Sequence, residues 1–145
     1  MTTKLRLSLL IAAFSSLCLF GCIDIVNKEV TINEVTKMKD SDVTKIVFSD
    51  GRGKNKPFTL KDKMKINEFL KMIDGYVIKK ESKHEEIKGW INAVDFYNGD
   101  KKLASITFSN PLKIDGVYYE IVKGQLSTEK IENFIKSINP DWKLQ

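Results

Sequence analysis

The amino-acid sequence predicts an α+β fold, in which an antiparallel sheet of five to six strands carries two helices packed on one face. Several segments rich in β-branched and aromatic residues follow one another with short polar turns between them, and strands joined by short turns pair antiparallel. Two other segments repeat apolar residues at intervals of three and four, which is typical of amphipathic helices. Each apolar helix stripe must be buried against another layer, and the sheet provides that layer.

The first half of the chain after about residue 29 is expected to contain short strands and one helix. Strand candidates occupy residues 30–32, a weak one, and residues 43–49, 57–60 and 76–80. A polar, glycine-punctuated segment at residues 50–55 predicts a turn. The helix is predicted over residues 61–73, where an apolar stripe recurs at the helical period and Asp74-Gly75 provides the end: Ile66, Phe69, Leu70 and Ile73.

The second half is expected to form two hairpins and a closing helix. Residues 90–97 are apolar on both faces, which predicts a central strand, and Asn98-Gly99 is a strong hairpin signal. Residues 102–109 alternate cleanly, and Asp115-Gly116 joins two further strands at residues 112–114 and 117–122. Ser127 is expected to cap the last helix, whose apolar stripe is Ile131, Phe134, Ile135 and Ile138.

The N-terminus has the features of a secretory signal. Lys4 and Arg6 precede an apolar run over residues 7–20, and the small residue Gly21 follows. Fourteen residues in a helix extend roughly 21 Å, whereas the hydrocarbon core of a bilayer is about 30 Å thick, so a membrane-spanning helix is not expected.

The end of this segment, Leu19-Phe20-Gly21-Cys22, resembles the lipobox of bacterial lipoproteins, although Phe20 stands where that motif usually has a small residue. The resemblance implies cleavage before Cys22 and attachment of diacylglycerol to its thiol. We therefore expect a signal peptide at residues 1–21, a lipidated tether at residues 22–28 and one α+β domain at residues 29–145. The implied location is the extracytoplasmic face of the cell membrane.

Composition excludes several classes of function. The signal contains two of the 24 basic residues and none of the 19 acidic ones, so the mature chain has a net charge of +3. Nucleic acid is not an expected partner, because of the compartment and because no basic block is interleaved with aromatic residues. Cys18 is removed with the signal and Cys22 is acylated, which leaves no thiol for a disulfide. His84 is the only histidine, so no zinc site of cysteine and histidine, and no cofactor, is expected.

An enzyme is not expected either. A Ser-His-Asp triad would have to use His84, which lies in the charged loop at residues 81–89 and is expected to be solvated there. Asp95 and Asp115 are the candidate carboxylate pair, but no spacing brings them together on one element.

A binding surface is the more plausible kind of site. If both helices cover one sheet face, alternation leaves part of the aromatic set on the other, beside the loop at residues 81–89. Tyrosine and tryptophan are favoured at interfaces because they combine a rigid contact area with a polar group. The opposite interpretation is that these aromatic residues complete the core and the sheet edges. The candidate binding residues are Trp90, Glu85, Glu86, Asp95, Tyr97 and Tyr118.

Part of the chain, roughly residues 43–142, resembles the C-terminal domain of the subtilin-type lantibiotic immunity lipoproteins. The resemblance rests on the runs Gly89-Trp90-Ile91-Asn92, Phe96-Tyr97-Asn98-Gly99, Ile106-Thr107-Phe108, Ile114-Asp115-Gly116-Val117-Tyr118-Tyr119 and Ile138-Asn139-Pro140-Asp141-Trp142. It implies a monomeric, lipid-anchored protein that sequesters a pore-forming lantibiotic or blocks its access to the membrane. Only the acylated Cys22 is carried over as a site.

Such peptides are cationic, so with a net charge of +3 any attraction must be local, through Glu81, Glu85, Glu86 or Asp95. The alternative is an accessory envelope lipoprotein, for example a partner of an ABC transporter or a sensor.

Overall fold

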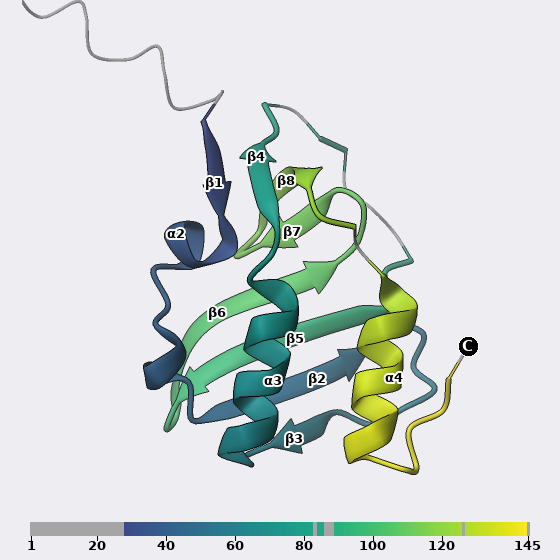
Figure 1. The fold of residues 1–145 in the computed structure, drawn as a ribbon. Helices are drawn as coiled ribbons and strands as arrows, with labels where there is room; N and C mark the ends of the chain where they lie inside the picture. Colours follow the sequence, from purple (N-terminus) through teal and green to yellow (C-terminus); the bar gives the residue numbers. More distant parts are fainter. Residues whose placement is uncertain (1–27, 83, 86–88, 126, 145) are drawn as a thin grey trace, which may run out of the picture.

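The computed structural model describes residues 28–145, except residues 83, 86–88, 126 and 145 (Figure 1). The expected signal peptide, Cys22 and the tether up to residue 27 therefore lie outside the described residues. The described chain has the predicted α+β class.

All strands of the domain belong to one antiparallel sheet of eight strands, so the prediction of five to six was too low. Three of the strands have only three residues each, which is too short to show an alternating pattern, yet each pairs fully with a neighbour. The order across the sheet is β1-β4-β8-β7-β6-β5-β2-β3, which confirms a central position for β5. The strands are β1 (Glu29–Thr31), β2 (Lys45–Asp50), β3 (Phe58–Leu60), β4 (Val77–Lys80), β5 (Asn92–Asn98), β6 (Lys101–Phe108), β7 (Leu112–Ile114) and β8 (Val117–Lys123).

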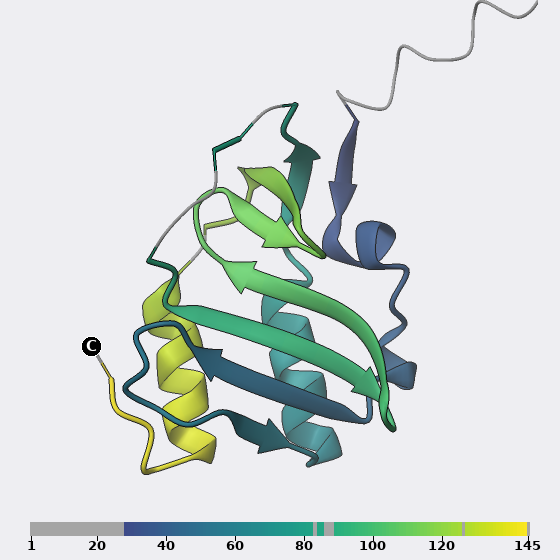
Figure 2. The same ribbon diagram turned by 180° about the vertical axis from the view of Figure 1, so that it is seen from behind.

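The two long helices lie on the same face of the sheet, and the view from behind shows the other face without a helix (Figures 1 and 2). They are α3 (Lys63–Ile73) and α4 (Thr128–Ile138), each of 11 residues. Asp62 and Ser127 cap them by accepting hydrogen bonds from the backbone N–H groups of Lys65 and Lys130. Both apolar stripes expected from the sequence point inward, although Ile138 is only half-buried.

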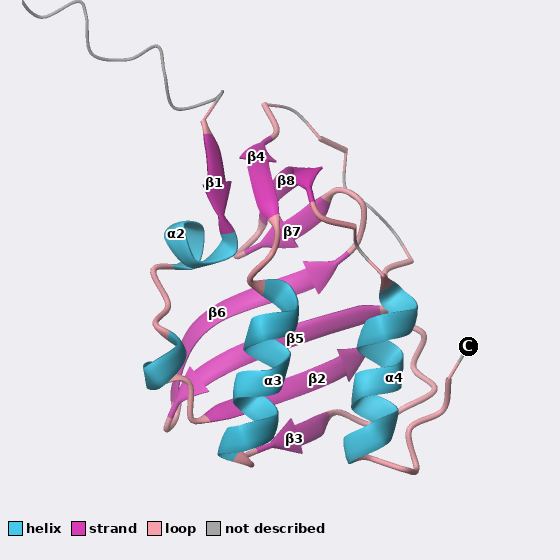
Figure 3. Ribbon diagram, in the orientation of Figure 1, coloured by secondary structure: helices cyan, strands magenta, loops and turns pink. Residues whose placement is uncertain are grey.

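A third, shorter helix was not predicted. Helix α2 (Ile32–Thr36) follows β1 directly, where the sequence predicted that the strand would continue to Ile32. Its start is a capping box: the Glu34 N–H donates to the Thr31 hydroxyl, and the Thr31 N–H donates to the Glu34 carboxylate over 2.7 Å. One 3₁₀ turn, η1 (Asp40–Asp42), then leads toward β2. Figure 3 shows these elements by type.

The core lies between the helices and the sheet and is rich in phenylalanine. The ring of Phe69, on α3, lies 5.1 Å from the ring of Phe48 and 5.2 Å from that of Phe134 between centroids. It also contacts Phe96 and Phe108 on the central strands, at 6.2 and 6.3 Å. Four of these five side chains are at most 1 % exposed. The Phe69 side chain on α3 therefore packs against α4 and against three strands, β2, β5 and β6.

Two sharp turns reverse the chain where the sequence predicts hairpins, but of the first predicted pair, Asn98-Gly99, only Gly99 has a positive φ. Gly99 joins β5 to β6 with a φ of 58°, and Asp115 and Gly116 join β7 to β8 with φ of 46° and 85°. Positive φ favours glycine and is tolerated by aspartate and asparagine, so these residues determine where the strands reverse. Within the described residues, no helix is long and apolar enough to cross a membrane.

Candidate functional site

The face of the sheet without helices, here called the open face, carries three of the predicted binding residues. On β5, Val94 and Phe96 point into the core and are fully buried, so Asp95 and Tyr97 point to the open face, and both are half-buried. On β8, Tyr118 pairs with Lys113 between the buried Leu112 and Ile114 and so shares this face. These three of the six candidate residues therefore share one face of the sheet.

Asp95 is already held by neighbours on the same face. Its Oδ1 accepts a hydrogen bond of 2.6 Å from the Ser105 hydroxyl and lies 2.8 Å from the Lys102 Nζ. The hydrogen bond to Asp95 raises the pKa of Lys102, although partial burial opposes the shift. Asp115, the other member of the candidate carboxylate pair, also contacts Ser105: it accepts a 2.8 Å hydrogen bond from the Ser105 backbone N–H. The Asp95 charge is thus neutralised locally.

The two tyrosines on the open face each have a lysine above the ring. The Nζ of Lys45 lies 4.5 Å from the centroid of Tyr97, and the Nζ of Lys113 lies 5.1 Å from that of Tyr118. These distances are those of cation–π contacts, which contribute about 0.5–1 kcal/mol at exposed sites. The aromatic surface of this face is therefore combined with positive charge.

The described part of the loop at residues 81–89 folds against the same strands. The His84 ring lies 4.4 Å from the Tyr118 ring, and its Nδ1 lies 2.7 Å from the Glu81 carboxylate. The residue is exposed overall, as expected for the solvated loop, although its contacts with Glu81 and Tyr118 leave 24 % of the side chain accessible. Glu85 is exposed as predicted, whereas Glu86 lies outside the described residues.

Trp90, another predicted binding residue, packs against the turn that follows β2. It precedes β5, is half-buried, and its ring lies against Gly51, where a Cβ atom would come within 2.6 Å of the indole. Gly51 therefore allows a close approach that any side chain would prevent. Two further aromatic residues, Trp142 and Tyr76, are core residues at 1 % and 8 % exposure. For these two, the core interpretation was the correct one.

A buried polar cluster under α4 was missed by the sequence reasoning. The side chain of Asp50 is fully buried and accepts four hydrogen bonds, two from the backbone and side chain of Arg52 and two from those of Asn55. Arg52 also pairs with Glu132 on α4, and Asn55 is hydrogen-bonded to the backbone of Lys143. Burial alone would raise the pKa of Asp50, but the hydrogen bonds from Arg52 and Asn55 outweigh it and lower that pKa below its ordinary value. The turn at residues 50–55 is thus tied to the last helix and to the C-terminal tail.

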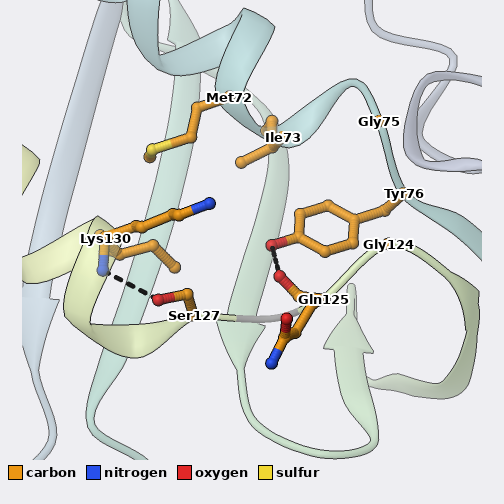
Figure 4. Close-up of a pocket in the computed structure, with 9 residues that line it drawn as sticks. Met72, Ile73, Gly75, Tyr76, Gly124, Gln125, Ser127 and Lys130 are labelled. Carbon is orange, nitrogen blue, oxygen red and sulfur yellow. Dashed lines mark hydrogen bonds between the residues drawn. The ribbon is translucent and has the colours of Figure 1, made fainter.

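A small pocket opens between the last turn of α3 and the first turn of α4 (Figure 4). Its volume is about 150 Å³. The Tyr76 hydroxyl donates a 3.1 Å hydrogen bond to the Gln125 carbonyl, which fixes the ring as one wall. Burial raises the pKa of this tyrosine, so it is protonated at neutral pH. The lining residues are Met72, Ile73, Gly75, Tyr76, Gly124, Gln125, Ser127, Lys130 and Ile131.

Across the described residues, no three histidine, cysteine, aspartate or glutamate side chains gather in a way that could hold a metal ion. Comparisons of the chain with protein-family models, with curated proteins and with solved structures found no match.

Proposed function

We propose that the protein is a lipid-anchored, extracytoplasmic binding module that protects its own cell from a lantibiotic peptide by sequestering it or blocking its access to the membrane. The lipobox-like N-terminus and the strand and turn runs that resemble lantibiotic immunity lipoproteins support this proposal. The observation that carries it is the open face, where Tyr97 and Tyr118 combine aromatic area with polar groups and no helix covers them.

On this proposal, contact with the peptide is mainly aromatic. Asp95 is paired with Lys102, so its carboxylate adds little free negative charge, and the Glu81 carboxylate is already in contact with the His84 ring. Exposed charge pairs contribute only about 0–1 kcal/mol each, and salt screens them. Peptide binding is therefore expected to depend more on the two tyrosine rings than on ionic strength.

The second candidate is the accessory lipoprotein, docked on a transporter or a sensor. The observation in its favour is the pair of lysines above Tyr97 and Tyr118, since a cationic peptide would have to displace or avoid them. Such a partner would present acidic groups to this face. Protection by the protein expressed alone separates the two candidates.

The anchor is tested by Cys22→Ala, which removes the only residue expected to receive diacylglycerol. We expect the variant to leave the membrane fraction or to keep its uncleaved signal, because one covalent lipid is otherwise the main membrane attachment. Cell fractionation with mass analysis measures this, and Cys18→Ala, which lies within the predicted signal, is the matched control. Recovery of the Cys22 variant in membranes at the mature mass would refute the lipoprotein assignment.

The open face is tested by the double variant Tyr97→Ser/Tyr118→Ser in a sensitive strain that expresses the protein. We expect survival in a lantibiotic titration to shift several-fold toward the unprotected strain. Met64→Ser on α3 is the control, because Met64 is 78 % exposed on the helix-covered side and should leave protection unchanged.

The melting temperature of each variant is measured alongside survival, so that loss of protection through unfolding is recognised. Full protection by a folded double variant would exclude the open face as the peptide site. Absence of protection by the unmodified protein would exclude the immunity function and favour the accessory lipoprotein.

A further inference from the structure

The pocket between α3 and α4 has an uneven distribution of charge. Among the nine described residues that line it, one is charged, Lys130, and none is acidic. Figure 4 shows the Lys130 side chain extending across the pocket from α4 toward Met72. The Ser127 hydroxyl, which accepts a hydrogen bond from the Lys130 backbone N–H, lies on the same side and can donate its own hydrogen. These groups favour a negatively charged ligand atom.

Met72, Ile73 and Ile131 form an apolar part of the wall, and Gln125 adds a polar side chain. Ile73 and Ile131 are each 2 % exposed, and Met72 is half-buried between them and solvent. A cavity of about 150 Å³ bounded by such side chains holds a group of roughly the size of benzene. The Tyr76 ring closes one side, and Gly124 lies so near it that a Cβ would come within 2.9 Å of the ring. The pocket thus has room for one small apolar group.

We propose that this pocket binds a carboxylate attached to a single small apolar group, with the carboxylate at Lys130 and Ser127 and the apolar part against Met72, Ile73 and Ile131. Two kinds of molecule have this chemistry: a free short-chain carboxylic acid, and the C-terminal residue of a peptide that ends in an apolar side chain. The inference does not rest on the function proposed for the open face, because the pocket lies among the helices on the other side of the sheet.

The experiment compares matched ligands that differ only in charge. The full-length chain in detergent is titrated by calorimetry with 4-methylpentanoate, with 4-methylpentanamide, and with a peptide ending in leucine as the free acid or as the amide. We expect each carboxylate to bind at least ten-fold more tightly than its amide, because hydrogen bonds to a charged partner are the stronger ones. Equal binding of acid and amide, or no binding of either acid up to tens of millimolar, would overturn the proposal.

Variants then locate the site. Lys130→Gln should reduce the preference for the acid to nearly one-fold, and Lys130→Arg should retain most of it. Lys71→Gln, an exposed lysine on α3 that does not line the pocket, should leave the preference unchanged. Met72→Trp should abolish binding of both acids by filling the apolar part, with an unchanged melting transition as its folding control. An equal loss in Lys71→Gln and Lys130→Gln would refute this location.

The same titrations distinguish the two sources of the ligand. Peptide acid that binds at least ten-fold more tightly than 4-methylpentanoate identifies peptide C-termini as the ligand. Comparable affinity of the two acids identifies the free acid, since the rest of the peptide then adds no contact.

Discussion

Replacing Phe69 by alanine is expected to lower the free energy of unfolding by about 3–5 kcal/mol, the usual range for removing a fully buried phenylalanine. The Phe69 side chain is fully buried, and its ring contacts four other phenylalanine rings, one each from β2, β5, β6 and α4. Its loss would leave a cavity bounded by both layers of the fold, where neither layer can collapse without breaking contacts with the other. Urea denaturation followed by tryptophan fluorescence measures the change.

Met64→Ala on the same helix is the control for Phe69. Met64 is 78 % exposed, and surface substitutions usually change stability by less than about 0.5 kcal/mol. A Phe69→Ala cost below about 1 kcal/mol would show that the phenylalanine cluster does not hold the helix on the sheet.

Replacing Asp50 by alanine is expected to cost several kcal/mol, because each buried donor left without an acceptor costs about 1–3 kcal/mol. Four donors lose their acceptor, and the Arg52 guanidinium, 16 % exposed, keeps only Glu132 as a partner in the cluster. Asp100→Ala is the control, since the Asp100 carboxylate is fully exposed and 3.6 Å from Lys45. We expect the control to unfold like the unmodified protein.

The contribution of Asp50 should also depend on pH with a definite sign. Its pKa in the folded protein is lower than the ordinary value of 3.8, so the folded state favours the ionised carboxylate. The stabilisation is then fully present above pH 4 and is lost as the pH falls through the lowered pKa of the folded state. The stability difference between the unmodified protein and Asp50→Ala should be constant from pH 5 to 8 and shrink below pH 4. A difference that grows toward acidic pH would contradict this assignment.

The elements that the sequence predicted well are those with a strong local signal. Gly99, Asp115 and Gly116 occupy positions of positive φ, so both hairpins depend on residues within the turns themselves. Helix α2 also has a local signal, the Thr31–Glu34 capping box, but its five residues are too few for an apolar period. The same limit explains the low strand count, because strands of three residues are held by their neighbours in the sheet and show no pattern of their own.

The residues of the candidate site also divide into those that a local sequence pattern predicts and those that only the folded chain brings together. Alternation along β5 was enough to assign Asp95 and Tyr97 to one face, since side chains in a strand alternate regardless of tertiary context. The Arg52–Glu132 pair joins residues 80 positions apart, and no sequence period relates them. The pocket likewise arises where the ends of two helices meet, so neither helix predicts it alone. Lys102, which pairs with Asp95, lies where the pairing register of β5 and β6 shifts, and strand alternation alone does not predict such a shift.

The position of β1 at one edge of the sheet determines how the domain would respond to mechanical load. If the chain is held on its N-terminal side, a pull reaches β1 first, and this strand has only three residues paired with β4 and nothing beyond it in the sheet order. Glu29–Thr31 would be peeled away before Ile32, which is 1 % exposed in the core. At about 3.4 Å per residue, the released segment adds roughly 10 Å of extensible chain. The seven remaining strands and both long helices would stay assembled, so the domain can yield at its attachment without losing either surface proposed to bind a ligand.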